Sequence, residues 1–277
     1  MGPGGPDMGS VGVREAPFRL GPHEVHVWTL RLDLPEAVHD RVAGVLSAAE
    51  TARAERFVVA AARTRYAAAR GLLRVILSGY VGRAPGDLTF EAGSGGKPAL
   101  AGVRGPRFNL SHAGAMGLVA VSAGAEVGVD VEEIREAGDL AGLAEKCFSP
   151  AERAAFAAVP ARLRRTAFFA GWTRKEAFLK VLGVGLTRPL ESFDVSLAPG
   201  EPARLLRVDG VPDAPARYAL RALEPAAGYV GAVAIEARGI TIRHRPWRTL
   251  SALVNETLTA RLEAAASGPA LVAERES

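Results

Sequence analysis

Carboxylates stand inside a stretch that otherwise has the pattern of a buried strand. In EVGVDVE, residues 126–132, small and β-branched residues lead to Asp130 and Glu132. Strand side chains alternate between faces, so these two acids point the same way and Glu133 points the other. Neighbouring carboxylates repel unless a proton or a cation lies between them, and magnesium in proteins is held by carboxylate, phosphate and water oxygens. The stretch therefore indicates either a magnesium site or a strand end whose acids reach solvent.

A third carboxylate follows in GWTRKEAFLK, residues 171–180. On a helix, Trp172, Glu176 and Lys180 share one face, and Lys175 lies about a quarter turn away. Glu176 could join the strand acids on a metal while a lysine contacts a phosphate; the alternative is an ordinary surface pair of Glu176 and Lys180. A buried helix favours the first interpretation, and the apolar residues that indicate burial are Phe168, Phe169, Trp172, Phe178 and Leu179.

A hydroxyl and an imidazole end an apolar strand in FNLSHAG, residues 108–114. Ser111 and His112 lie before a glycine turn, a place where they can hold a phosphate group. A serine hydrolase is excluded here, because no G-x-S-x-G sequence surrounds the serine. The alternative is a turn with a locally hydrogen-bonded serine and a structural histidine.

The glycine-rich stretch GSGGKPAL, residues 93–100, is not a P-loop. That motif needs glycine at position 91 and serine or threonine after the lysine. Glu91 and Pro98 stand at these positions. The stretch therefore predicts a hairpin with Lys97 at its edge.

The composition is that of a globular protein with a large core, since 48% of the 277 residues are apolar and 23% are charged. The net charge of +4 favours anionic partners, but scattered basic residues do not indicate nucleic acid. Cys147 is the single cysteine, the N-terminus lacks a signal-peptide pattern, and no apolar run reaches membrane-spanning length. We therefore expect a cytoplasmic protein without an intrachain disulfide and without a membrane-spanning segment.

Helix starts are marked by two capping boxes, Ser47 with Glu50 and Ser149 with Glu152. The first opens a broken helical region, and the second precedes a helix expected over 161–182. Glycines should end these helices, near Gly79 or Gly82 in the first case and at Gly183 and Gly185 in the second. A last amphipathic helix is indicated by Leu250, Leu253, Val254, Leu258 and Leu262.

Strands are expected between these helices, on both sides of residue 120, which predicts an α+β fold. Residues 1–15 and the last dozen residues have the composition of disordered ends. The expected strands are 24–34, 87–91, 97–100, 107–112, 117–124, 126–132, 192–197, 216–223 and 229–237.

Taken together, these stretches resemble the 4′-phosphopantetheinyl transferase superfamily, specifically its larger Sfp-type branch. The similarity covers the chain from about residue 25 to 237, and although each motif alone is weak, five in the right order are specific. The motifs are GKP at 96–98, NLSH at 109–112, GVDVE at 128–132, FSPAE at 148–152 and WTRKEAFLK at 172–180.

The resemblance implies two similar α/β halves in one monomeric chain, with coenzyme A and a magnesium or manganese ion in the cleft between them. The N-terminal half would comprise residues 16–118, and the C-terminal half, with the metal-binding acids, residues 119–240. Residues 241–277 form an extension beyond the shared pattern, expected to be a helix followed by disorder.

Motif matching assigns the metal to Asp130, Glu132 and Glu176. It places Lys180 on the coenzyme A diphosphate, with Lys175 close by.

The same matching assigns the rest of coenzyme A to the N-terminal half. Ser111 and His112 would hold its phosphates, Lys97 its adenine or ribose-phosphate end, and Arg53 its 3′-phosphate. A second basic position of the family is Glu50 in this chain.

The implied reaction is attack of a carrier-protein serine on the phosphate that bears pantetheine, with 3′,5′-ADP as the leaving group. Lys180 would steady the leaving side, and the serine proton would go to Glu176, to a metal-bound water or to Glu152. The partners would be acyl or peptidyl carrier proteins, in polyketide or nonribosomal peptide synthesis. Phe148 and Phe156 are candidates for the carrier-docking surface, with core packing as the alternative.

Three other classes of protein fit the sequence less well than a transferase. A non-catalytic protein with the same fold is disfavoured because all three metal carboxylates are present. A magnesium-dependent nucleotide hydrolase would need a more acidic helix, and a basic interaction module would need clustered charge.

Overall fold

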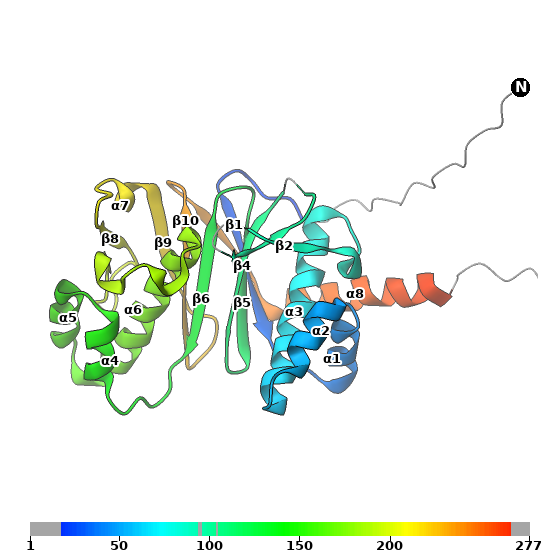
Figure 1. Cartoon of the computed structure of the whole chain (residues 1–277), viewed down its shortest axis with the longest axis horizontal. Coiled ribbons are helices and arrows are strands. Elements are labelled where there is room, and N and C mark those ends of the chain that lie inside the picture. Colours follow the sequence, from blue (N-terminus) through cyan, green and yellow to red (C-terminus); the bar gives the residue numbers. More distant parts are fainter. Residues whose placement is uncertain (1–17, 94–95, 104, 267–277) are drawn as a thin grey trace, which may run out of the picture.

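A computed structural model describes residues 18–93, 96–103 and 105–266 of the chain. Its elements form four layers, two sheets back to back in the centre with helices outside each sheet (Figure 1). The fold is α+β, which confirms the fold class expected from the sequence. The expected disorder of residues 1–15 and of the last dozen residues lies outside the described residues.

The first sheet has the strand order β11-β1-β5-β4. Its strands are β1 (Glu24–Arg31), β4 (Arg107–Ala113), β5 (Met116–Ser122) and β11 (Thr241–Arg245). β5 is antiparallel to β1 and to β4, whereas β11 runs parallel to β1. Helices outside this sheet are α1 (Glu36–Ala43), α2 (Ala48–Glu55), α3 (Ala60–Val81) and α8 (Trp247–Ala266).

The second sheet has the order β6-β10-β9 and is antiparallel throughout. Its strands are β6 (Val127–Glu133), β9 (Tyr218–Leu223) and β10 (Tyr229–Glu236). The helices of this half are α4 (Leu140–Cys147), α5 (Pro150–Ala157), α6 (Ala161–Leu182) and α7 (Ala214–Arg217). Two short hairpins complete the fold, β2 (Phe90–Ala92) with β3 (Pro98–Leu100), and β7 (Phe193–Val195) with β8 (Leu205–Val208).

Two units of the chain repeat one order of elements. The N-terminal unit, residues 24–122, has the sheet order β1-β5-β4, and the C-terminal unit, residues 127–236, has the matching order β6-β10-β9. Each unit contains a short helix with a capping box followed by a 22-residue helix, α3 or α6. Each long helix ends at a glycine with positive φ, Gly82 at 66° and Gly183 at 69°, a conformation that glycine adopts without steric cost.

Three clusters of buried side chains hold the layers together. One lies between the first sheet and its helices, one between the second sheet and α6, and one between the two sheets. The third cluster is rich in valine, as expected where both sheet faces are buried, and it includes Val25, Val27, Val127, Val129 and Val131. β4 of the N-terminal unit also lies against β6 of the C-terminal unit.

The two predicted domain boundaries fall at β5 and at β11. The boundary expected between residues 118 and 119 falls inside β5, whose neighbours β1 and β4 belong to the N-terminal unit. The extension after residue 240 begins with β11, which joins the N-terminal unit, and α8 then packs on β1 and α3 through Leu250, Val254 and Leu258. The division into domains stays a prediction.

Phe148 and Phe156, the candidates for carrier docking, are core residues. They are 2% and 7% exposed and stack on each other and on Phe168. The alternative of core packing is therefore correct for this pair, because side chains so enclosed offer no surface to a partner.

Candidate active site

Gly128 lets the backbone of α6 lie directly on β6. A Cβ atom at this position would collide with the carbonyl oxygen of Ala177 and come within 2.7 Å of the Val181 nitrogen. Any other residue would push the helix away from the strand, so the glycine of GVDVE is needed for this approach. The close approach brings the acids of β6 within reach of the side chains of α6.

Lys180 is the centre of the resulting cluster. Its Nζ donates to Asp130 Oδ1 at 2.6 Å, to Ser111 Oγ at 3.0 Å and to the Val129 carbonyl at 3.2 Å. The Ser111 hydroxyl donates to the same Asp130 oxygen at 2.7 Å. Three predicted site residues, from β4, β6 and α6, therefore converge on one point between the two units.

Asn109 fixes the position of β4 relative to β6. Its side-chain oxygen accepts a hydrogen bond from the Val129 nitrogen at 2.9 Å, and Asn109 is 9% exposed. This cross-strand contact holds Ser111, two residues along β4, opposite Asp130. Asn109 stands in the NLSH motif, but its sequence context predicted no role for it.

Glu132 and Glu176 lie beside this cluster, each half-buried. Burial and the neighbouring charge of Asp130 raise the pKa of Glu132, and the indole nitrogen of Trp172 donates to its Oε1 at 3.2 Å. Burial and the charge of Asp130 likewise raise the pKa of Glu176, and no described residue donates a hydrogen bond to its carboxylate. The charges of the three acids therefore interact, as the sequence predicts for carboxylates that share a site.

The donor atoms of this cluster have the chemistry that a metal site needs. Asp130 Oδ2 is buried and has no hydrogen-bond partner in the described structure, while Oδ1 is taken by Lys180 and Ser111. The available donors are carboxylate oxygens, which suit a hard cation such as magnesium. As they stand, however, no three acidic, histidine or cysteine side chains among the described residues are gathered closely enough to hold an ion. The metal assignment of Asp130, Glu132 and Glu176 stays a prediction.

His112 follows Ser111 on β4, and Lys97 lies just before β3. The His112 side chain keeps contact with solvent, while partial desolvation by neighbouring atoms and the charge of Lys180 lower the pKa of its imidazole, which keeps the ring neutral near pH 7. Lys97 Nζ donates to Glu126 Oε2 at 2.9 Å and to the Val127 carbonyl at 2.6 Å. Lys97 therefore lies at the start of β6, three residues or about 10 Å of strand from Asp130.

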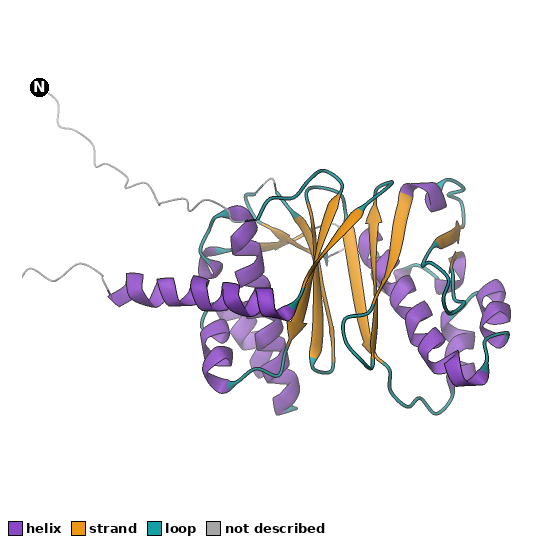
Figure 2. Ribbon diagram, turned by 180° about the vertical axis from the view of Figure 1, so that it is seen from behind, coloured by secondary structure: helices purple, strands orange, loops and turns teal. Residues whose placement is uncertain are grey.

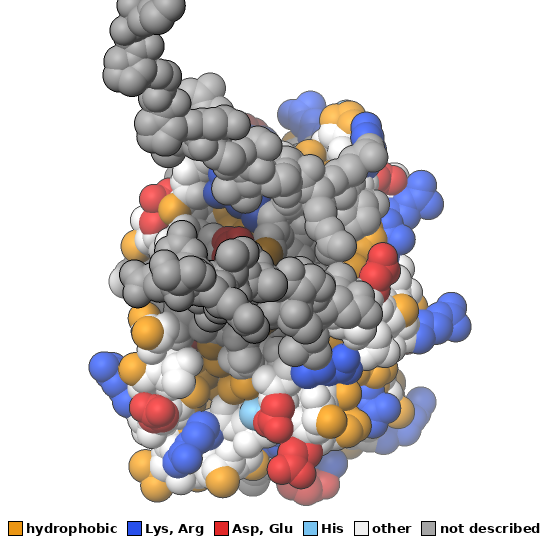
Figure 3. Space-filling model, turned by 90° about the vertical axis from the view of Figure 1, so that its right-hand side faces the viewer, with side chains coloured by type: hydrophobic (Ala, Val, Ile, Leu, Met, Phe, Trp, Pro, Cys, Tyr) orange, Lys and Arg blue, Asp and Glu red, His pale blue; other side chains and the backbone are white. Residues whose placement is uncertain are grey.

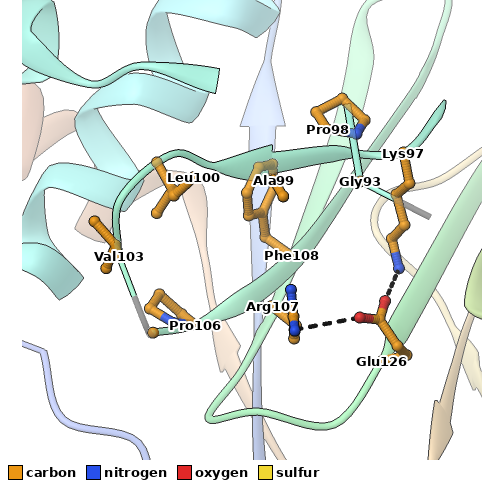
Figure 4. Close-up of a pocket in the computed structure, with 11 residues that line it drawn as sticks. Gly93, Lys97, Pro98, Ala99, Leu100, Val103, Pro106, Arg107, Phe108 and Glu126 are labelled. Atoms are coloured by element: carbon orange, nitrogen blue, oxygen red, sulfur yellow. Dashed lines mark hydrogen bonds and ion pairs between the residues drawn. The ribbon is translucent and has the colours of Figure 1, made fainter. Parts of the chain in front are cut away.

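Lys97 borders a pocket between β3, β4 and the turn before β6 (Figure 4). Lys97 and Arg107 both point toward Glu126, whose Oε1 lies 3.2 Å from Arg107 Nε. The remaining wall is mainly apolar and is formed by Pro98, Ala99, Leu100, Val103, Pro106 and Phe108.

Glu152 and Lys175 are not brought to the cluster. They pair with each other at 2.6 Å in the core of the C-terminal unit, where Lys175 is 0% and Glu152 2% exposed. The Lys175 ammonium also donates to the Phe193 carbonyl at 2.8 Å, and Glu152 accepts from the Ser149 and Val195 nitrogens. This enclosure argues against the predicted roles of Glu152 as a base and of Lys175 as a coenzyme A contact.

Arg53 is also apart from the cluster. It is exposed on α2, and its guanidinium carbon lies 5.9 Å from the centre of the Tyr66 ring. Its assignment to the 3′-phosphate stays a prediction.

Comparison with known proteins identifies the family. Residues 126–234 match the family model of the 4′-phosphopantetheinyl transferase superfamily. The chain is 40% identical over 219 residues to the 4′-phosphopantetheinyl transferase HetI of Nostoc sp., a match that covers 78% of this chain and 89% of HetI. It is 35% identical over 171 residues to psf-1 of Bacillus pumilus, covering 62% and 70% of the two chains. Sfp of Bacillus subtilis is 29% identical over 126 residues, which cover 46% and 55%.

The chain belongs to the 4′-phosphopantetheinyl transferase superfamily, an enzyme family of transferases. Within it, the likeness to Sfp and psf-1 places the chain in the Sfp-type branch. Both statements confirm the resemblance drawn from the five sequence motifs.

Proposed function

We propose that this protein transfers the 4′-phosphopantetheine group of coenzyme A to a serine of apo acyl or peptidyl carrier proteins, and that the reaction requires magnesium. The observation that carries the proposal is the contact of Lys180 with both Asp130 and Ser111, beside Glu132 and Glu176. Polyphosphate substrates need fixed cations and hydrogen-bond donors at one point, and this cluster supplies an ammonium, a hydroxyl and metal-binding carboxylates.

The proposed adenine and diphosphate sites follow one another along β6, in the order in which these groups occur in coenzyme A. The pocket beside Lys97 would receive the adenine end, and Ser111, His112 and Lys180 would bind the diphosphate about 10 Å further along the strand. Lys97 would have to exchange Glu126 for a ligand oxygen in order to contribute its charge.

The metal would be held by Asp130, Glu132 and Glu176. When bound, it supplies positive charge to the diphosphate of coenzyme A. Lys180, already on Asp130 Oδ1, is placed to contact the leaving side, and Trp172 fixes Glu132 through its indole N–H.

Glu176 is our choice for the group that accepts the serine proton. No described residue hydrogen-bonds to its oxygens, so one oxygen can accept the proton while the other contacts the metal. Glu152 is disfavoured for this role because Lys175 and two backbone nitrogens occupy its oxygens.

One chain supplies the whole site, because Ser111 belongs to the N-terminal unit and Asp130 and Lys180 to the C-terminal unit. We therefore propose a monomeric enzyme. Its carriers would be acidic domains of polyketide or nonribosomal peptide synthases, which the net charge of +4 would attract. On the part of the surface that Figure 3 draws in colour, basic and acidic side chains are interspersed.

Intact-mass spectrometry tests the proposal directly. An apo carrier protein is incubated with the enzyme, coenzyme A and magnesium, with EDTA in a parallel sample. A single gain of one phosphopantetheine, absent with EDTA, is expected. Coenzyme A binding without any gain on several carriers would favour the non-catalytic alternative.

No helix in the described part of the chain is both long and apolar enough to cross a membrane.

A further inference from the structure

A groove runs along the outer side of β9, at the edge of the second sheet. It lies between β9, the β8 hairpin strand, α7 and the loop that leads from β10 to β11. In Figure 2, β9 is the last long strand of its sheet, with the short hairpin and α7 beyond it. We call this feature the β8–β9 groove, and its walls include Arg204, Leu206, Tyr218, Arg221 and Arg238.

The charged side chains of the β8–β9 groove are all arginines. Arg204, Arg221 and Arg238 line it, and no acidic residue is among its lining residues. Within the described structure, Arg204 and Arg238 make no side-chain hydrogen bond or ion pair, and Arg221 contacts only the Leu220 carbonyl, at 2.9 Å. Arginines near the groove are neutralised instead, as Arg217 is by Glu236 at 2.6 Å. The groove therefore carries three charges without counter-charges.

Both strands that border the groove have a free edge. In the described structure β8 pairs with β7 alone, and β9 pairs with β10 alone. A strand at a sheet edge presents unpaired N–H and C=O groups that can pair with another extended chain. An apolar contact is also available, because Leu206 of β8 is 53% exposed while its neighbour Leu205 is 5% exposed.

We propose that the β8–β9 groove binds an extended acidic peptide segment of a partner protein. The segment pairs with the edge of β9, its carboxylates contact the three arginines, and an apolar side chain covers Leu206. The groove is open and its arginines are exposed, which suits a chain segment better than an enclosed small anion. Single-stranded nucleic acid is disfavoured, because Tyr218 is the one aromatic residue that lines the groove, whereas successive bases stack on several aromatic side chains.

The site is separate from the proposed transfer chemistry. β9 lies two strands away from β6, about 10 Å across the sheet, so a bound segment leaves Asp130 and Lys180 accessible. Binding at the groove can therefore be measured independently of phosphopantetheine transfer.

Fluorescence anisotropy of the full chain tests this proposal with labelled ten-residue peptides. An alternating Glu-Val peptide is expected to bind with an affinity that falls between about 50 and 300 mM salt, and a Lys-Val peptide is expected not to bind. A Glu-Pro peptide, which lacks half of the backbone donors, should bind at least about tenfold more weakly if strand pairing contributes.

Matched variants locate the binding. Charge reversal of the groove, Arg204→Glu with Arg221→Glu and Arg238→Glu, should weaken Glu-Val binding by at least about tenfold. The control reverses three exposed arginines elsewhere, Arg31→Glu with Arg83→Glu and Arg162→Glu, with the same change in net charge, and should retain most of the affinity. Equal losses in both triple variants, no binding of the Glu-Val peptide, or tighter binding of a single-stranded oligonucleotide would each overturn the proposal.

Discussion

Lys180 Nζ lies 2.6 Å from Asp130 Oδ1, in a contact between α6 and β6 that also includes the Ser111 hydroxyl of β4. The Lys180 ammonium thus links Asp130, a proposed metal ligand in the C-terminal unit, to Ser111 in the N-terminal unit. The second oxygen of Asp130 is buried without a hydrogen-bond partner in the described structure. A lysine and a cation can therefore act on the same carboxylate through different oxygens.

Replacement of Lys180 by methionine should slow transfer strongly. The change removes the ammonium that contacts Asp130 and Ser111 but keeps most of the aliphatic side chain. We expect kcat/KM for coenzyme A to fall by about 10²–10³-fold, the usual effect of losing one transition-state donor. Steady-state transfer kinetics measure this, with Lys146→Met on the exposed side of α4 as the control. An unchanged kcat/KM in Lys180→Met would exclude the proposed contact with the substrate.

Magnesium binding should release protons because of Glu176. Burial and the charge of Asp130 raise the pKa of this carboxyl, so part of the population carries a proton at pH values where a free glutamate is ionised. The pKa of this group is higher in the folded protein than its value of about 4.5 in the unfolded chain. Its contribution to stability is therefore fully present below pH 4.5 and is lost as pH rises through the folded-state pKa. The contribution of Glu176 to the stability of the metal-free protein should therefore fall as pH rises above 4.5, and bound magnesium should offset that loss.

Calorimetric titration of magnesium near pH 6, in two buffers of different ionisation enthalpy, measures the released protons. Glu176→Gln should release fewer protons than the unmodified protein and bind the ion more weakly. Identical proton release in both proteins would show that Glu176 does not titrate with the ion.

Glu152→Gln should affect stability more than catalysis. The change leaves the fully buried Lys175 without its counter-charge, which should cost about 3 kcal/mol or more of unfolding free energy. Transfer per folded molecule should change by less than about threefold, because Glu152 does not reach the Asp130 cluster. Denaturant titration and transfer assays on the same preparations separate the two effects. A stable Glu152→Gln protein with little transfer activity would instead support the role of a general base.

Glu50 offers a matched control for that variant. It occupies the same place in the N-terminal unit, in a capping box with Ser47 and in buried pairs with Arg70 and Arg74. Glu50→Gln should also lower the free energy of unfolding without a direct effect on transfer.

His26 should make the protein sensitive to mild acid. Burial, together with the charge of Arg245, lowers the pKa of His26 to about 4, and its side chain is 1% exposed and hydrogen-bonded to the Tyr80 hydroxyl. The unfolded chain takes up this proton near pH 6.5 and the folded chain does not, so stability falls as pH drops from 6.5 toward 4. The full effect would be roughly 3 kcal/mol, since one pKa unit corresponds to about 1.4 kcal/mol. Urea unfolding at pH 7 and at pH 4.5 measures it.

His26→Gln removes the titrating ring and serves as the comparison. Its unfolding free energy should fall less between the two pH values than that of the unmodified protein, even if the variant is less stable at pH 7. Equal decreases in both proteins would assign the acid sensitivity to other groups.

Local sequence patterns predicted the elements around the site well. Both capping boxes form, and α6 spans residues 161–182 and ends at Gly183 as expected, because caps and glycine stops act within a few residues. Asp130 and Glu132 lie on one strand face, where strand alternation places them.

Contacts between distant segments were not predictable in the same way. The pairing of β11 with β1 joins residues 241–245 to residues 24–28, and no local pattern specifies such a distant partner. Lys175 and Lys180 look alike in WTRKEAFLK, yet Lys175 turns into the core to meet Glu152 while Lys180 meets Asp130. Asn109 could have been noticed as a polar residue inside an apolar strand, but its partner nitrogen, on Val129, is visible only in the fold.

The most direct test of the proposed site compares Asp130→Asn with Glu133→Gln in the transfer of phosphopantetheine to an apo carrier protein. The two acids lie on opposite faces of β6, and Asp130 is buried in the cluster while Glu133 is exposed. We predict that Asp130→Asn lowers kcat/KM by about 10³-fold or more at saturating magnesium while the unfolding free energy changes little, and that Glu133→Gln has less than about threefold effect. Near-normal transfer by a folded Asp130→Asn protein would contradict the assignment of this carboxylate to the reaction.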